Sequence, residues 1–326
     1  MKKKIIIISI SIIALLIVFI VGMAFSRDKG TPFLIKQDKF MIGIYEGTDP
    51  FNLQPAAQAS NPVLQAKDVT DVEAVFIADP FMIQGDDKKW YMFFEVMNAD
   101  SWQGDIGMAS SNDGYHWKYE KIVLNEHFHM SYPYVFKWEN DYYMIPETMN
   151  AYAVRLYKAK NFPDEWEFAD NIIYGDLSDP SIVRYNDKWW IFATGGIDAN
   201  VFRLYYADNL TGPWIEHPES PLEFAFQNAT LAREGGRLIV YNNQLYRFAQ
   251  NNIAGYGNSV RAFMVDTLTT TEYKEHLLKE DAVIRGDGEG WNANGMHNLD
   301  LHQISDSKWL AVVDGYKKGI LFGHKY

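Results

Sequence analysis

The chain has 326 residues, of which 15% are aromatic, and its 30 basic and 42 acidic residues give a formal net charge of −12. This acidic balance argues against a nucleic-acid partner, which requires a basic surface. The sequence contains no cysteine, so disulfides, thiolate metal sites and a cysteine nucleophile are excluded. The length is usual for one large all-β domain.

The N-terminus has the pattern of a membrane anchor. Three lysines, Lys2 to Lys4, precede an uncharged apolar run from Ile5 to Phe25. This run is long enough for a single transmembrane helix, and the lysines place the rest of the chain on the extracellular side of the cell membrane. The alternative is a signal peptide that is cleaved after secretion, with Gly22-Met23-Ala24 as the cleavage site. We therefore expect an anchor or signal sequence over 1–26, a linker over 27–37 and an exported domain over 38–326.

A repeated module dominates the exported domain. In each copy a polar residue begins an apolar strand, and a turn leads to an aromatic strand that ends in a polar residue. The first strands begin at Asp79, Tyr132, Asp179, Asn228 and Asp300, and the second strands end at Glu95, Glu147, Thr194, Asn242 and Asp314. Five all-strand repeats predict an all-β, five-bladed β-propeller.

The remaining segments fit this ring. Strand-like runs and turns such as Asn112-Asp113-Gly114 follow the second strands and predict the outer strands of each blade. The last repeat lacks an outer strand, and Phe40 to Tyr45 can supply it, which would close the ring without an exposed edge. We expect the piece from Tyr246 to Trp291 to hold a large insertion between blades four and five.

Acidic residues recur at the positions that should face the channel. The first strand of each blade lines a propeller's channel, so Asp79, Asp179 and Asp300 should lie near one axis, with Tyr132 and Asn228. The residues that end the second strands, Glu95, Glu147 and Asp314 among them, should border the same site. Converging carboxylates suit acid–base cleavage of a glycosidic bond, because repulsion and burial separate their pKa values. The structural alternative is that Asp-Pro at a strand start is only a turn device.

Other side chains suit substrate binding. His297 and Asp300 should lie at the channel mouth, where they would bind sugar hydroxyls, or a water or metal ion, with calcium the ion that carboxylates suit. A purely structural histidine is the alternative, and the histidine spacing matches no zinc motif, so no cofactor or metal ligand is predicted. Trp102 and Trp291 lie in loops rich in Gly and Asn, which predicts sugar stacking, with blade packing as the alternative.

These motifs resemble a known family. The pieces Ala78-Asp79-Pro80-Phe81, Ser131-Tyr132-Pro133, Met144-Ile145-Pro146-Glu147-Thr148, Asp179-Pro180-Ser181, Gly295-Met296-His297 and Val313-Asp314-Gly315 are similar to the N-terminal domain of glucosamine inositolphosphorylceramide transferases. That domain resembles the five-bladed propellers of the arabinanase, fructosidase and levansucrase superfamily. The resemblance covers about residues 70 to 316. In the plant proteins, transferase chemistry belongs to a separate C-terminal domain.

The resemblance also implies roles. The superfamily's blade-one aspartate is the base or nucleophile, which corresponds to Asp79, and Glu147 is the best match for the acid. Asp179 begins its strand where that acid often does, so it orients substrate or exchanges roles with Glu147. Tyr132 replaces a second aspartate.

Together these observations predict an extracellular glycoside hydrolase or transglycosylase that acts on a polysaccharide or oligosaccharide. Its catalytic residues would be Asp79, Glu147 and Asp179. The predicted substrate-binding residues are Glu95, Tyr132, Asn228, His297, Asp300, Asp314, Trp102 and Trp291. The alternative is a non-catalytic glycan-binding or polysaccharide-assembly module.

Overall fold

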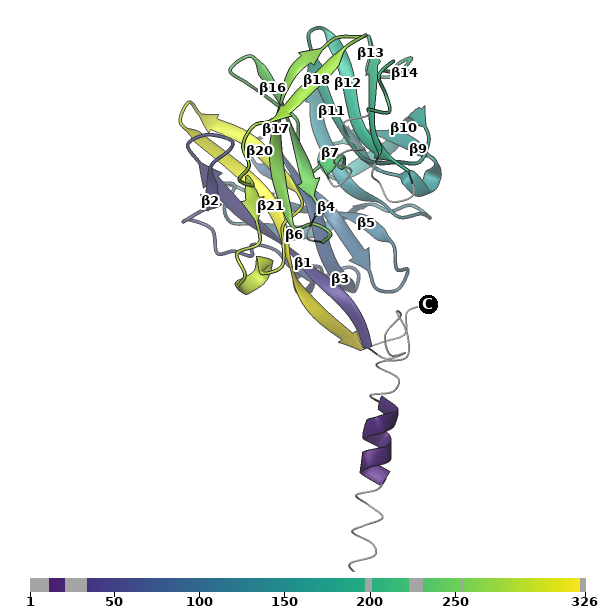
Figure 1. Ribbon diagram of the computed structural model, residues 1–326, viewed down its shortest axis with the longest axis vertical. Coiled ribbons are helices and arrows are strands. Elements are labelled where there is room, and N and C mark those ends of the chain that lie inside the picture. The colour runs from purple at the N-terminus through teal and green to yellow at the C-terminus, as the bar shows by residue number, and fades with distance from the viewer. Residues whose placement is uncertain (1–11, 21–33, 197–200, 223–230, 254, 323–326) are drawn as a thin grey trace, which may run out of the picture. The chain divides into compact units, whose positions relative to one another are not determined.

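Five β-sheets make up most of the protein (Figure 1). The computed structural model describes residues 12–20, 34–196, 201–222, 231–253 and 255–322. Each sheet contains a path of four neighbouring strands, as the repeats predict. Residues 40–317 group into a single unit, and the parts of the chain before and after it form a second one.

Blades one to four take their strands in chain order, and blade five combines the last two strands with the first two. Blade one contains β3 (Ala74–Gln84), β4 (Trp90–Asn98), β5 (Gly104–Ser111) and β6 (Lys118–Leu124). Blade two contains β7 (Ser131–Trp138), β8 (Asp141–Glu147), β9 (Ala153–Asn161) and β10 (Glu165–Tyr174). Blade three contains β11 (Leu177–Tyr185), β12 (Lys188–Gly195), β13 (Val201–Ala207) and β14 (Ile215–Glu216). Blade four contains β15 (Ile239–Tyr241), β16 (Gln244–Asn251), β17 (Ser259–Leu268) and β18 (Tyr273–Leu277), with β19 (Ile284–Arg285) paired to β17. Blade five contains β20 (Leu299–Ser305), β21 (Lys308–Phe322), β1 (Leu34–Gly47) and β2 (Leu53–Pro55).

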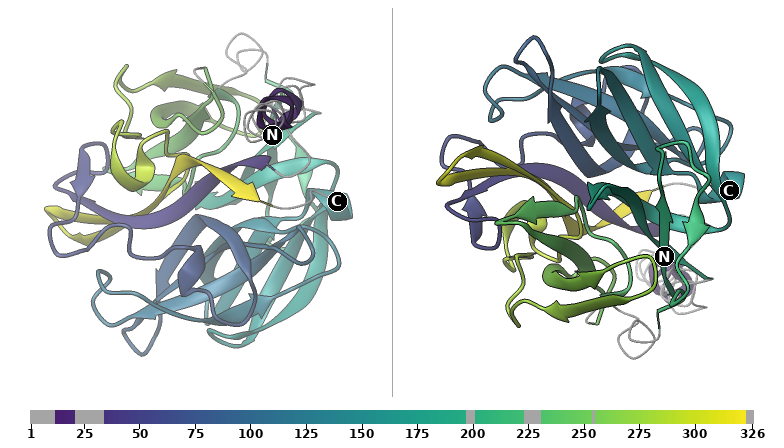
Figure 2. Two further views of the ribbon diagram at one scale, coloured as in Figure 1. Left: turned by 90° about the horizontal axis from the view of Figure 1, so that it is seen from below. Right: turned by 90° about the horizontal axis from the view of Figure 1, so that it is seen from above.

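The blades surround a common centre (Figure 2). The inner strands β20, β3, β7 and β11 contact one another in that order, and Gly236 of blade four bridges to Leu299 at the start of β20. In blade five the sheet order is β2-β1-β21-β20, so the N-terminal strand lies beside the C-terminal one. The five-bladed propeller and its predicted closure are therefore confirmed.

Burial explains the strand sequences. The second strand of blade one, β4, reads WYMFFEVMN and is buried along almost its whole length. A strand covered on both faces by neighbouring blades needs a continuous apolar sequence. The outer strand β6 reads KYEKIVL and is largely exposed or half-buried, which suits a charged edge that resists pairing with other chains.

The inner strands of blades one, two and three share a bulge. Pairing with the second strand shifts register between Ala78 and Phe81, and equivalent shifts occur in β7 and β11. The bulged residues are Asp79, Tyr132 and Asp179, with φ angles of 51°, 46° and 48°. Each is followed by proline, which has no N–H for the ladder. Left-handed non-glycine residues cost about 1–3 kcal/mol and cluster at functional sites, so the repeated bulge before proline marks these three positions as candidates for a functional role.

Blade four differs from its predicted form. The segment from Arg237 to Asn242 contains the first strand, β15, and not the second one. Its hairpin turns at Asn242 and Asn243, both with positive φ, and the second strand is β16. The piece expected as an insertion between blades, from Tyr246 to Trp291, therefore supplies most of blade four itself, β16 to β19.

The N-terminal segment is described only in part. Residues 12–20 are helical and exposed, whereas most of the predicted span from Ile5 to Phe25 lies outside the described residues. Within the described ranges, no helix has the length and apolar character needed to cross a membrane.

Candidate functional site

Five buried carboxylates gather at one rim of the propeller. We call them the mouth cluster: Asp79, Glu95, Glu147, Asp179 and Asp314. Each of the five is at most 6% exposed. Burial raises the pKa of Glu95 well above its ordinary value, and the charges of the other four add to that rise. The cluster thus joins residues of second strands with bulged residues of first strands. Glu147 ends β8 as predicted, whereas Glu95 and Asp314 lie inside β4 and β21 and do not end them.

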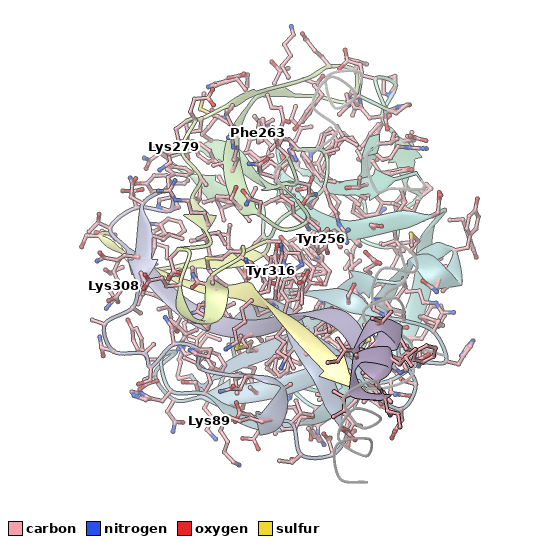
Figure 3. The ribbon with its side chains drawn as sticks, turned by 60° about the horizontal axis from the view of Figure 1, so that its bottom comes forward. Lys89, Tyr256, Phe263, Lys279, Lys308 and Tyr316 are labelled. Atoms are coloured by element: carbon pink, nitrogen blue, oxygen red, sulfur yellow. The ribbon has the colours of Figure 1, made fainter. Side chains whose placement is uncertain are left out.

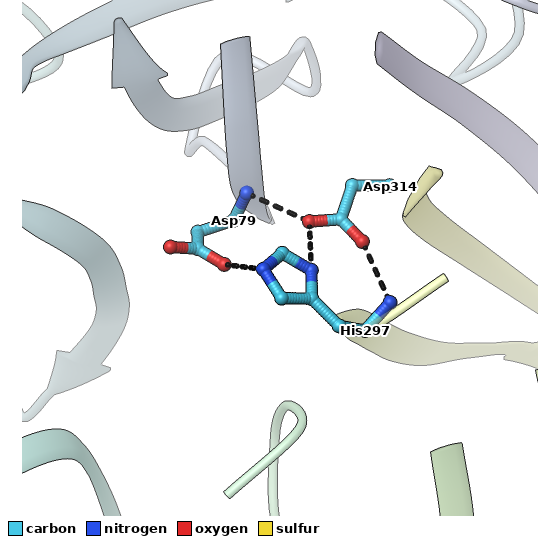
Figure 4. A group of neighbouring side chains, drawn as sticks. All are labelled: Asp79, His297 and Asp314. Atoms are coloured by element: carbon cyan, nitrogen blue, oxygen red, sulfur yellow. Dashed lines mark hydrogen bonds and ion pairs between the residues drawn. The ribbon is translucent and has the colours of Figure 1, made fainter. Parts of the chain in front are cut away.

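A histidine links two members of the cluster (Figure 4). His297 Nδ1 lies 2.6 Å from Asp314 Oδ2, and its Nε2 lies 3.5 Å from Asp79 Oδ1. The two backbone N–H groups of His297 and Asn298 donate to Asp314 Oδ1, and the N–H of Asp79 donates to Asp314 Oδ2. The pKa of His297 rises to about 9. Burial lowers this pKa, but the negative charges of Asp314 and Asp79 raise it by more than burial lowers it. A charged imidazolium therefore lies between the two aspartates at neutral pH.

An arginine holds the other side of the cluster. Arg233 Nε donates to Asp179 Oδ2 at 2.5 Å, and its NH2 nitrogen lies 3.7 Å from Glu147 Oε2. Gln250 Nε2 donates to the same Asp179 oxygen at 3.1 Å, and the N–H of Asp179 donates to Glu147 Oε2 at 3.2 Å. Asp179 is thereby fixed in place, while Glu147 lies beside it with a weaker hold on the guanidinium.

Glu95 faces a second histidine. The backbone N–H of Gly104 donates to His129 Nδ1 at 2.8 Å, so the proton of a neutral ring lies on Nε2. That nitrogen is 3.7 Å from Glu95 Oε1. A Cβ atom on Gly104 would lie 2.2 Å from the carbonyl oxygen of Met130, so only glycine allows this close approach. His129 is 28% exposed and borders the cluster.

The carboxylates have different proton affinities. Burial, with smaller contributions from Asp179 and Asp314, raises the pKa of Asp79 to about 7, although His297 opposes the rise. Burial and the neighbouring Asp179 raise the pKa of Glu147 well above its ordinary value. The site therefore combines a glutamate whose pKa is raised above its ordinary value with an aspartate whose pKa, about 7, lies close to neutral pH. This pairing is what proton donation and proton acceptance in one reaction require.

Two predicted binding residues lie inside the channel instead of at its mouth. Tyr132 is completely buried, and its hydroxyl bonds to Ser181 Oγ and to the backbone of Gly236. Asp300 is also completely buried; it pairs with Arg237, which approaches its two oxygens. Both side chains are satisfied within the protein and lack solvent access, which favours a structural role; their role in substrate binding stays a prediction.

The three other residues predicted to bind substrate differ in where they lie. Trp102 lines a surface groove that also contains His129. Trp291 packs over the backbone of Gly43 and Gly315, where an added Cβ would lie 2.6 and 2.9 Å from its ring, so it acts in blade packing. Asn228 lies outside the described residues.

Sequence reasoning missed three residues near the cluster. Arg233 and Gln250 belong to blade four. There the sequence pattern of the first strand, β15, predicts a second strand instead. Tyr256, near the centre of Figure 3, is 47% exposed and contacts both Arg233 and His297, with ring-centre distances of 5.5 and 5.4 Å. An exposed aromatic ring over a polar site is a common sugar-stacking surface. The signal available for Tyr256 was its position in a loop between glycines, Gly255 and Gly257.

Two aspartates and a histidine of this site have side-chain types that can bind a metal ion. Donor atoms of Asp79, His297 and Asp314 all lie within 4.8 Å of one another. However, both oxygens of Asp314 already accept backbone N–H groups, and the histidine contacts both carboxylates. Calcium takes six to eight oxygen ligands, whereas this group offers one carboxylate without a backbone donor, so it fits an ion-pair network better than the calcium site considered from the sequence.

The fold is shared with solved enzyme structures. A GH43 protein from Bacillus licheniformis matches with a TM-score of 0.54 and 14% identity, over 77% of this chain and 54% of that one. A family 117 glycoside hydrolase from Zobellia galactanivorans matches with a TM-score of 0.50 and 13% identity, over 85% of this chain and 90% of that one. At these identities the likeness establishes the propeller fold alone.

Sequence relatives are much closer. Glucosamine inositolphosphorylceramide transferase 1 of Oryza sativa subsp. japonica is 36% identical over 303 residues, and that of Arabidopsis thaliana is 31% identical over 301. These alignments cover 86% of this chain but only 40% and 39% of the relatives. The family model for the N-terminal part of these proteins matches residues 36–316. The chain therefore belongs to the family of glucosamine inositolphosphorylceramide transferase 1 N-terminal domains.

Proposed function

We propose that this protein is a carbohydrate-active enzyme that cleaves or transfers a glycosidic bond at the mouth cluster. The observation that carries the proposal is the pairing of Glu147, a buried acid with a raised pKa, with Asp79, whose pKa of about 7 suits a general base. Glycosidases use two carboxyl groups in these two roles. The names of the relatives, which are glycosyl transferases acting on a glycolipid, and the hydrolase names of the structural neighbours support a sugar substrate.

The reaction needs only these groups and water. Asp79 accepts a proton from a water molecule whose oxygen attacks the anomeric carbon. Glu147 donates its proton to the leaving glycosidic oxygen, so the bond breaks with charge balanced. In transfer, a sugar hydroxyl replaces the water. Asp179 stays paired with Arg233, and this pair orients substrate hydroxyls.

A direct assay tests the proposal. We would incubate the protein with a panel of polysaccharides and detect new reducing ends, for the natural chain, Asp79→Asn and Glu147→Gln. The matched control is Asp187→Asn, because Asp187 is a fully exposed residue in a hairpin turn of blade three. Turnover that survives Asp79→Asn in a folded protein would contradict the assignment.

A glycan-binding module without catalysis is the second candidate. The contact of Arg233 with Glu147, in addition to Asp179, favours it, because a bound guanidinium stabilises the ionised glutamate and opposes proton donation. This candidate predicts glycan affinity that is the same in the natural chain and in Glu147→Gln, with no turnover on any substrate.

A further inference from the structure

A polar groove opens beside the mouth cluster. It has a volume of about 620 Å³ and lies between blades one and two. The loop after β4 supplies Trp102 and Gln103, the segment before β7 supplies His129, and the short helix η2 (Met149–Ala151) supplies Asn150. Ligand sites in proteins span roughly 300–1,000 Å³, so the groove is large enough for a ligand in its own right.

One residue joins the groove to the cluster. His129 lines the groove, and its Nε2 faces Glu95 at 3.7 Å. All the groove loops leave the rim where β4 and β8 end, which is the rim that carries Glu95 and Glu147. A ligand that fills the groove would therefore extend toward the carboxylates along the His129 side chain.

The lining has the chemistry of sugar recognition. Trp102 is only half-buried, has a φ of 54°, and donates its backbone N–H to the carbonyl of Asn98. The guanidinium of Arg155 packs on Phe128 at 4.7 Å and on Phe168 at 4.9 Å, and among the described residues its buried Nε has no hydrogen-bond partner. An aromatic platform beside rigid hydrogen-bond donors suits a pyranose ring and its hydroxyls.

The charges around the groove restrict the class of ligand that it can bind. Glu126 Oε1 lies 3.4 Å from Arg155 NH1 and also accepts a hydrogen bond from the hydroxyl of Tyr157. The arginine charge is thus balanced within the protein. A sulfate or phosphate group would have to compete with Glu126, whereas neutral hydroxyls would not.

We propose that this groove is a second sugar subsite, which binds the neutral sugar next to the one held at the mouth cluster. The inference rests on the proposed function and specifies its substrate as an oligosaccharide of at least two units. The bound chain runs from the carboxylates past His129 onto the face of Trp102.

Binding as a function of chain length tests the subsite. Calorimetric titrations would use xylo-, arabino-, galacto- and cello-oligosaccharides of one to six units, with Asp79→Asn as the background so that no ligand is cleaved. We expect at least one series to gain about tenfold or more in affinity between one and three units. Trp102→Asn, which keeps a residue tolerant of positive φ, and Asn150→Ala should each remove most of that gain, about five- to tenfold. Tyr185→Asn, at the hairpin of blade three on the opposite rim, is the control and should keep it.

The outcomes separate the two proposals. The subsite is overturned if the gain in affinity with chain length persists in both groove variants. It is also overturned if affinity does not change with chain length. In either case, turnover that requires Asp79 would still support the proposed function. If no oligosaccharide binds and no polysaccharide is cleaved, the proposed function fails and the subsite fails with it. Circular dichroism of each variant confirms that it is folded, and the two groove variants act independently, so misfolding of one leaves the other decisive.

Discussion

The mouth cluster and the channel interior use the same residue types in opposite ways. Inside the channel, Arg237 pairs with Asp300, and His302 Nε2 lies 3.1 Å from that aspartate. Burial raises the pKa of Asp300, but Arg237 and His302 lower it by more, so it lies below its ordinary value. At the mouth, Arg233 and His297 contact four carboxylates between them, and the fifth, Glu95, faces His129; burial keeps the pKa of Asp79 high. Burial is common to both regions, so what distinguishes the mouth from the interior ion pair is its excess of acidic over basic side chains.

The largest effect should come from the mouth. Asp79→Asn and Glu147→Gln each remove a proton-transfer group, and we expect turnover to fall by at least about 10²- to 10⁴-fold. The thermal midpoint should stay about equal, because each amide has the shape of the neutral acid that burial favours at its position. Reducing-end assays and thermal melts measure the two quantities. A lower midpoint together with unchanged specific activity would reverse the contrast between the regions.

Removing an interior charge should instead damage the fold. Asp300→Asn leaves Arg237 buried beside a neutral partner, which should cost about 3–5 kcal/mol in the free energy of unfolding. The double variant Asp300→Leu with Arg237→Met should lose less, since no unpaired charge remains. Urea titration measures both.

An exposed pair provides the control for that experiment. Lys188 and Asp208 form an ion pair whose aspartate is 79% exposed, and Asp208→Asn should cost no more than about 1 kcal/mol. Equal losses in the free energy of unfolding for Asp208→Asn and Asp300→Asn would show that the buried pair stabilises the fold no more than the exposed pair.

The fold was accessible from sequence because its signals repeat. Apolar inner strands, polar residues at their ends and turn residues between them recur, so errors in one blade do not change the architecture. Blade four shows the limit: its first strand, β15, has only three residues, and Arg237 to Tyr241 reads like an aromatic second strand. Tertiary pairing, and not local pattern, decides which strand is innermost there.

The site residues could be predicted from the sequence only where the copies of the repeat were aligned correctly with one another. Asp79, Glu147 and Asp179 were predicted together because equivalent positions in a propeller converge. Arg233 and Gln250 depended on the register of blade four and were missed with it. For Tyr132 and Asp300, alignment gave the position but not the depth, since burial depends on which side chains from other blades fill the channel. Export of the propeller remains a prediction.

Stability should fall as pH rises. The pKa of Asp79 goes from an ordinary 3.8 to about 7 on folding, and that of His297 goes from 6.5 to about 9. The folded state therefore binds more protons, and this stabilisation, complete below the ordinary values, is lost as pH rises through about 7 and about 9. Between pH 7 and 9 we expect a loss on the order of 3 kcal/mol, most of it from His297, measured by urea titration.

Histidine variants identify the source of that slope. His297→Gln should flatten the dependence between pH 6.5 and 9, because it removes the imidazole whose pKa rises from 6.5 to about 9 on folding. His116→Gln, a change at a largely exposed histidine, should leave it as it is. An unchanged slope in His297→Gln would mean that other groups carry the linkage.

The smallest effect concerns the tyrosine that replaces an aspartate. Tyr132→Phe removes a hydroxyl that accepts the N–H of Gly236 and bonds to Ser181, which should cost about 1–3 kcal/mol. Tyr152→Phe is the matched control, since Tyr152 also has a positive φ, of 54°, but is 63% exposed, and its cost should stay within about 0.5 kcal/mol. Because the hydroxyl of Tyr132 has no solvent access, the loss should appear in urea titration and not in the KM for any glycan. A raised KM with unchanged stability would show that Tyr132 contacts the substrate, and that the substrate site extends into the channel interior.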